Sequence, residues 1–444
     1  MASGNWLRRL LGLGAPATAP KTAPKTAPLR PAAPAATAPV STPVPDAVFF
    51  GRRSPLVDAK GRVAGFELRL PLSLELRFDG QAEARHAAAH HLALLASAGT
   101  LVRSGLTPLV PLSVALLARD RVCDAVPTGV WLLLDRLADL PQHLGSALRT
   151  RGVKLGTWDG PPRRDPAIDF VAVRAAVGGV DTLQLSAQRW SEANPKLRMV
   201  ALDLRSLSDL ELVLRSGYSL AGGRLSRDGP TQNPRPLGAA AHRICELITH
   251  LALDRDTALI SQAVQGDAVL SYRLLRYANS PAIGLAQPVE AIEAAVAILG
   301  RAELGRWLSV MLLAAASGRQ AAAAIQSQAL ATGRMFELLA RDKGESVPEV
   351  LFTLGLLSQL HLLLEMPMQA ALEPLRLSEP LRQALLQRSG PWAPYLELAA
   401  ELESDDETTA ERAATPFGGL AAVMQRAETA WDWARGMTGS LGAD

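Results

Sequence analysis

The chain has 444 residues, of which 48% are hydrophobic and 20% charged, and its formal net charge is +3. This length predicts two or three domains, because one domain usually takes about 100–200 residues. The apolar fraction excludes a chain that is disordered throughout, and the composition excludes collagen-like and disulfide-rich proteins. The two cysteines, Cys123 and Cys245, stand far apart and outside any metal-binding spacing, as expected of a reduced, cytoplasmic protein.

Residues 1–46 are predicted to form a disordered tail and linker. From residue 15 onward this segment is almost entirely Ala, Pro and Thr, which offer no apolar face to bury. Its five basic residues account for the excess positive charge, so the rest of the chain is not expected to bind nucleic acid. Trp6 and the leucines after it would allow a weak peripheral membrane contact, and a frayed terminal helix is the alternative. No apolar run is long enough to predict a transmembrane helix.

Residues 47–230 alternate short apolar runs with longer stretches of helical spacing. Such alternation predicts a mainly parallel sheet, and eight runs suggest a closed (β/α)8 barrel. The barrel would be small for its class, so some of its helices must be short. The expected strands lie within 47–51, 63–70, 108–115, 129–135, 152–158, 169–175, 198–204 and 218–224, and the expected helices within 81–104, 136–150, 175–194 and 206–216.

Residues 239–444 are predicted to be entirely helical. Ala and Leu recur there at helical spacing after a boundary rich in Pro, Gly and Asn at 228–238. One helix should end at Gly300, and another should be interrupted near Gly266 and Asp267. The polar, acidic stretch 401–416 is predicted to be an exposed loop.

A specific pattern lies within 251–312, and it resembles the HDOD domain, a helical signalling module related to the HD hydrolases. The residues that carry the resemblance are Asp267, Leu270, Leu274, Leu275, Asn279 and Ser280, followed by Ala291, Ile292, Leu299 and Gly300. The resemblance assigns residues 239–444 to an HDOD helical domain, and it implies a structural or partner-binding role for Asp267, Leu274, Asn279, Ser280 and Gly300. For Asn279 we favour a structural cap over a ligand, because an amide can bond backbone groups where a helix ends.

Catalytic HD hydrolases hold a metal through a His-Asp doublet. The matching region here is 355–365, in which Ser358 and Gln359 occupy the doublet position and His361 has no adjacent Asp. The resemblance therefore implies binding rather than hydrolysis.

The segments 49–70 and 207–227 resemble the opening and the end of the EAL domain, the barrel of cyclic di-GMP phosphodiesterases. Glu67 would be the signature glutamate, and Gly217 and Gly223 are in place. The resemblance also implies metal ligands at the strand ends, and most of these are lost. The replaced or altered positions are Pro111, Asp135, Gly156 to Asp159, Ala172, Arg174, Arg205 and Gly222.

Two metal ions need several anionic oxygens, and of the implied ligands only Glu67 clearly survives. We therefore predict no catalytic residue, no metal and no cofactor. The predicted function is a non-catalytic adaptor of bacterial signal transduction that contacts other signalling proteins through its HDOD domain. One alternative is a sensor that binds cyclic di-GMP through Glu67, Arg174 and Arg205. Both arginines could instead pair with acids such as Asp203 or face solvent. A metal-dependent phosphodiesterase is the last alternative.

Overall fold

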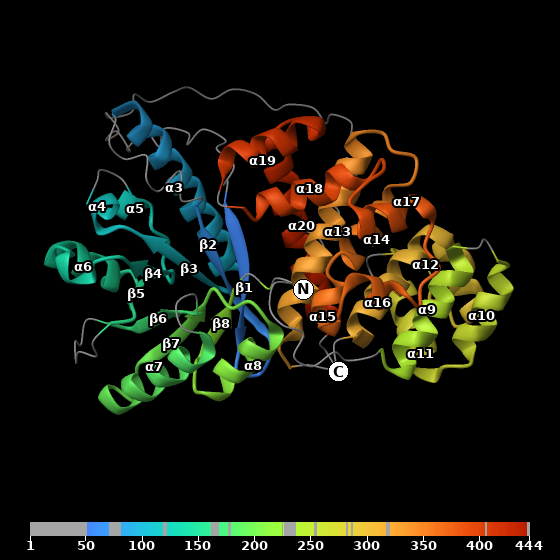
Figure 1. The fold of residues 1–444 in the computed structure, drawn as a ribbon, viewed down its shortest axis with the longest axis horizontal. Helices are drawn as coiled ribbons and strands as arrows, with labels where there is room; N and C mark the ends of the chain where they lie inside the picture. The colour runs from blue at the N-terminus through green and yellow to red at the C-terminus, as the bar shows by residue number, and fades with distance from the viewer. Residues whose placement is uncertain are drawn as a thin grey trace, which may run out of the picture.

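The computed structural model shows a barrel joined to a helical half (Figure 1). The predicted tail, its membrane contact and residues 47–50 of the first expected strand lie outside the described residues. The structure describes residues 51–70, 81–118, 122–160, 168–175, 179–223, 225, 237–252, 255–280, 283–285, 287–316, 320–404 and 406–441.

Eight strands close into a barrel in the order of the sequence, which confirms the predicted fold class. The strand β1 runs antiparallel to both of its neighbours, and every other adjacent pair is parallel. The strands are β1 (Arg52–Asp58), β2 (Val63–Arg69), β3 (Thr107–Leu112), β4 (Trp131–Leu134), β5 (Lys154–Trp158), β6 (Phe170–Arg174), β7 (Arg198–Leu202) and β8 (Leu220–Gly222).

The first strand departs from the prediction in place and direction. It lies at Arg52–Asp58 rather than at 47–51. The sequence pattern did not predict a strand there, because two arginines and a proline interrupt the apolar residues. A tight turn joins it to β2: the Asp58 carboxylate accepts hydrogen bonds from the backbone N–H groups of Lys60 and Arg62, and Gly61 has a φ of 77°. A turn this short can only join antiparallel strands, since a parallel crossover needs a dozen or more residues.

Helices cover most of the outside of the barrel, and apolar side chains fill its inside. The rings of Trp131 and Phe170 lie 4.9 Å apart among buried Leu133, Val200 and Leu202. The barrel is therefore a packed core and not a pore. Its helices are α3 (Gln81–Arg103), α4 (Val114–Leu117), α5 (Val122–Ala125), η1 (Leu137–Asp139), α6 (Gln142–Thr150), α7 (Gly179–Ala193) and α8 (Leu207–Arg215).

The described part of the second half is helical, as predicted. Its helices are α9 (Ala239–Ala252), α10 (Thr257–Gln265), α11 (Ala268–Ala278), α12 (Ile292–Ala316), η3 (Gln320–Ala322), α13 (Ala323–Asp342), α14 (Pro348–Leu357), α15 (Leu360–Leu364), α16 (Met368–Leu372), α17 (Glu379–Arg382), η4 (Gln383–Gln387), α18 (Ala393–Leu402), α19 (Glu407–Ala414), η5 (Thr415–Phe417) and α20 (Leu420–Leu441).

Two helix breaks in this half were predicted, and one loop was predicted wrongly. The break at Gly266 and Asp267 separates α10 from α11, and Gly300 interrupts α12 with a φ of 67°. The stretch 401–416, predicted as a loop, contains α19. Asp406 caps this helix by accepting from Thr408 N–H. Ala410 and Ala414 are buried on its inner face together with Glu407, and the exposed polar residues form the outer face of a short helix.

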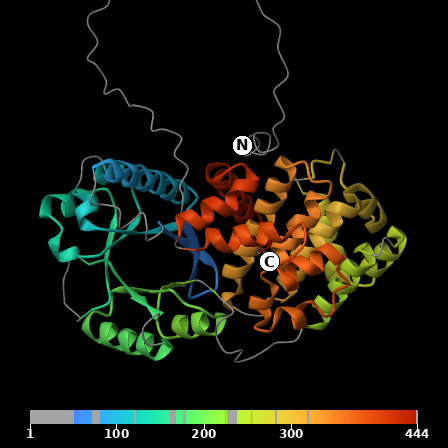
Figure 2. The same ribbon diagram turned by 45° about the horizontal axis from the view of Figure 1, so that its top comes forward.

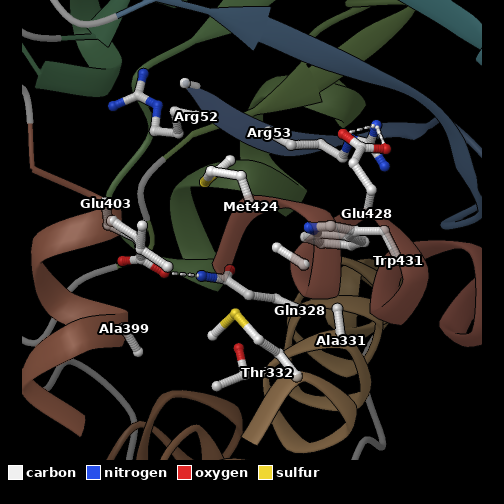
Figure 3. Close-up of a pocket in the computed structure, with 14 residues that line it drawn as sticks. Arg52, Arg53, Gln328, Ala331, Thr332, Ala399, Glu403, Met424, Glu428 and Trp431 are labelled. Atoms are coloured by element: carbon white, nitrogen blue, oxygen red, sulfur yellow. Dashed lines mark hydrogen bonds and ion pairs between the residues drawn. The ribbon is translucent and has the colours of Figure 1, made fainter. Parts of the chain in front are cut away.

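The two halves share an interface, in which helix α13 packs on the outer side of β1 and β2 and helix α20 contacts both strands through its side chains (Figures 1 and 2). The ring of Trp431 in α20 meets the ring of Phe66 in β2 edge to face at 5.2 Å. A cavity of about 90 Å³ remains at this interface, and Arg53 and Glu428 pair across it (Figure 3). The helical half therefore covers the part of the outer barrel surface that a helix of the barrel would otherwise cover.

Among the described residues, no helix combines the length and the apolar character that crossing a bilayer requires.

Candidate functional site

The carboxyl ends of the parallel strands form one mouth of the barrel, and the start of the antiparallel β1 lies at the same end. Arg52 pairs with Arg69 across the β1–β2 ladder, and Ser54 pairs with Glu67. Because side chains alternate along a strand, these four residues share one face. That face is the inside of the barrel, since Leu56 on the same side belongs to the interior cluster.

Glu67 is buried at this mouth and is held by arginines. Its side chain is 1% exposed, and Arg69 donates to its carboxylate at 2.5 Å. The guanidinium of Arg52 lies 3.8 Å from its other oxygen. A buried carboxylate is stable when such cations offset its loss of hydration.

Asp203 lies beside the same two arginines and also beside Arg174. It follows β7 with a φ of 60°, which few residues other than glycine adopt. Its carboxylate lies 3.4 Å from Arg52, 3.4 Å from Arg69 and 3.5 Å from Arg174. The bend at Asp203 packs closely against Gly223. A Cβ atom added to Gly223 would lie 2.1 Å from the backbone nitrogen of Leu204, the residue after Asp203.

The mouth therefore contains a network of three arginines and two carboxylates, which we call the arginine network: Arg52, Glu67, Arg69, Arg174 and Asp203. Arg174 is half exposed, and its guanidinium lies 3.9 Å from the centre of the Trp158 ring. Cation–π stacking of this kind fixes a guanidinium in place.

The predicted ligand residues do not all meet. Glu67 and Arg174 belong to the arginine network, whereas Arg205 is exposed, and no described hydrogen bond or ion pair involves it. The interpretation that Arg174 pairs with Asp203 agrees with the structure. Sequence reasoning missed Arg52 and Arg69, although the period-two alternation around Glu67 could have placed Arg69 on the same face.

The residues at the mouth do not fit a pair of divalent cations. Both carboxylates of the arginine network are already neutralised, and three guanidiniums would repel cations. Two further acids are committed elsewhere: Asp135 accepts from Val114 N–H, and Asp159 accepts from Ser186 and Trp190. Within the described part of the chain, no three His, Cys, Asp or Glu side chains are placed to hold a metal.

The predicted HDOD residues have structural contacts in the helical half. Asp267 caps α11 by accepting from two backbone N–H groups, and Leu274 is fully buried. Asn279 donates to Val289 O at 2.8 Å and accepts from Val289 N–H at 2.6 Å, so it ties the end of α11 to the segment before α12. Ser280 belongs to the turn at the end of α11, where its backbone N–H donates a hydrogen bond to Tyr277 O.

At the position of the HD doublet, Ser358 donates to Gly355 O at 2.6 Å and caps the end of α14. The buried charge of this half lies elsewhere: Glu337 is fully buried and pairs with Arg306, Arg334 and Arg341. This cluster has the character of a structural ion-pair network, because each charge has a partner.

Residues 236–377 match the family model described as the HDOD domain. The helical half contains an HDOD domain. The match begins just before α9 and ends beyond α16, so α17 to α20 follow the HDOD domain in sequence.

Other comparisons are more distant. A curated protein of Bacillus subtilis strain 168, described as "Uncharacterized protein YuxH", is 24% identical over 216 residues, which are 48% of this chain and 53% of that protein. This chain thus matches about half the length of that relative. Among solved structures, Klebsiella pneumoniae BlrP1 in a calcium and cyclic di-GMP complex is 18% identical, with a TM-score of 0.32, over 39% of this chain and 53% of that one.

An EAL domain protein of Listeria monocytogenes is 15% identical with a TM-score of 0.31, over 38% of this chain and 84% of that one.

Proposed function

We propose that this protein is a non-catalytic adaptor of bacterial signal transduction, in which a degenerate EAL-like barrel supports an HDOD domain that binds other signalling proteins. The observation that carries the proposal is the arginine network: guanidinium groups neutralise both carboxylates at the place where phosphodiester hydrolysis by two metals would need anionic oxygens. The HDOD helices offer the surface for partners.

The preferred partner surface is the exposed face of α11. Val269 and Tyr272 are each 61% exposed on neighbouring turns of this helix, and the guanidinium of Arg276 lies 5.9 Å from the Tyr272 ring. Aromatic and arginine side chains dominate the binding energy of many protein interfaces. These three residues therefore form the part of the HDOD domain that we expect partners to contact.

A capture experiment with the full-length chain tests this proposal. Tyr272→Glu and Val269→Glu are expected to release the partners that the wild-type chain retains from cell extract. The matched control is Leu185→Glu, because Leu185 is 62% exposed on α7 of the barrel. Partners that stay bound to both HDOD variants, or that only the barrel variant releases, would refute the placement on α11.

A second candidate function is a cyclic di-GMP sensor without hydrolysis. It is favoured by Arg174, whose guanidinium stacks on Trp158 at the mouth while half of its side chain remains exposed. Arginine and tryptophan together suit a phosphate and a base. Titration of the full-length chain with cyclic di-GMP, wild type against Arg174→Ala, tests it: no saturable binding up to about 1 mM would end this candidate.

A further inference from the structure

A second cavity lies at the opposite end of the barrel from the arginine network, and we call it the basal cleft. Its volume is about 850 Å³, and residues of both halves line it. The barrel contributes the β1–β2 turn and the residues that precede β3. The helical half contributes one side of α11, α12, α13 and α20.

Three arginines from three elements line the basal cleft. Arg62 belongs to the β1–β2 turn, Arg273 to α11 and Arg435 to α20, and the one acidic residue in the lining is Asp432. Arg435 pairs with Asp432, and Arg62 pairs with Asp58 at 2.9 Å while its side chain stays 70% exposed. The lining itself contains three arginines and one carboxylate, so its formal charge is positive.

The floor of the basal cleft is apolar. Val310 and Leu313 of α12 and Leu330 of α13 are buried in the core and also line the cavity. On the barrel side, Val63 and Leu106 are only partly buried. A small-molecule site usually has a volume of about 300–1,000 Å³, an apolar lining and a few polar groups that orient the ligand. The basal cleft has a volume in this range, apolar residues from both halves and three arginines that can orient a ligand.

We propose that the basal cleft binds a phosphate-bearing organic molecule of nucleotide size, which contacts both halves at once. The planar fork of each arginine suits phosphate oxygens, and the apolar floor suits a base or another flat ring. The proposal goes beyond the adaptor function, and the cleft lies at the opposite end of the barrel from the arginine network.

Calorimetric titration of the full-length chain tests the proposal, with ATP and GTP as probes, tripolyphosphate as a probe for charge alone and adenosine as a probe for the ring alone. At least one nucleotide is expected to bind more tightly than both partial probes. Arg273→Ala and Arg62→Ala should each weaken that binding about tenfold, which corresponds to about 1.4 kcal/mol. Arg62 is exposed, so its replacement leaves the fold intact.

Arg412→Ala is the matched control, because it removes an exposed arginine of α19 that does not line the cleft. Arg174→Ala separates binding at the mouth from binding in the cleft. The proposal is overturned if no nucleotide gives saturable binding up to about 1 mM. It is also overturned if Arg174→Ala weakens the binding while both cleft variants leave it unchanged.

Discussion

Arg53 of β1 donates hydrogen bonds to both carboxylate oxygens of Glu428 of α20, at 2.9 and 2.8 Å, across 375 positions of sequence. Only 4% of the Arg53 side chain is exposed. Burial lowers the pKa of Arg53, and the charge of Glu428 opposes that shift. The pair therefore couples the stability of the barrel to the position of the last helix.

Replacing Glu428 with Gln should destabilise the protein. The substitution leaves a buried guanidinium without its counter-charge, and removing one partner of a buried pair costs about 3–5 kcal/mol. The free energy of unfolding, measured in urea, checks this. Asp342→Asn is the control: it breaks the exposed pair of Asp342 with Arg426, which joins α13 to α20, and should cost below about 1 kcal/mol. Equal losses in the two variants would contradict a special role for Arg53.

Gly300 should resist replacement by alanine. Its φ of 67° and ψ of 173° lie in a region that only glycine adopts readily, so Gly300→Ala is expected to cost about 1–3 kcal/mol. Gly305→Ala in the same helix is the control, because that glycine is helical and an added Cβ meets nothing closer than 3.8 Å. It should be neutral or stabilising by up to about 1 kcal/mol. The Tm of both variants, measured by thermal unfolding, tests this prediction. A Gly300→Ala protein with the Tm of the wild type would refute this explanation of the helix break.

Cys245 should be unreactive in the folded protein. Burial, aided by the charge of Glu246, raises the pKa of its thiol to about 11. Since the folded-state pKa lies above the reference value of 9.0, the contribution of this thiol to stability is complete below about pH 9 and declines as the pH rises toward 11. Alkylation at pH 8 of a Cys123→Ser variant should therefore be slow until urea unfolds the chain. Rapid alkylation of the native variant would contradict the prediction.

Much of the fold could be predicted because its signals are local. Strands β2 to β8 are apolar runs bounded by turns, and the main barrel helices lie where Leu and Ala recur at helical spacing. The β1 strand was missed because Arg52, Arg53 and Pro55 hide its alternation. The packing of α13 and α20 on the barrel could not be predicted, since it depends on contacts such as Phe66 with Trp431 between distant segments.

The candidate site could be predicted only in outline. Glu67 and Arg174 were found through the resemblance to the EAL domain. The arrangement around them depends on Arg52, which reaches the mouth only because β1 is antiparallel, and on the bend at Asp203. Arg205 stands two positions after that bend, and no described ion pair joins it to Glu67 or to Asp203.

Guanidinium groups already satisfy both carboxylates at the barrel mouth, so these acids should not hold divalent cations. Titration of the full-length chain with Mn²⁺, followed by electron paramagnetic resonance and by hydrolysis of cyclic di-GMP, tests it most directly. We expect only weak Mn²⁺ binding, with a Kd above about 1 mM that is the same in the wild type and in Glu67→Gln, and no hydrolysis. Tight binding of two ions per chain that Glu67→Gln abolishes, together with hydrolysis by the wild type, would contradict it.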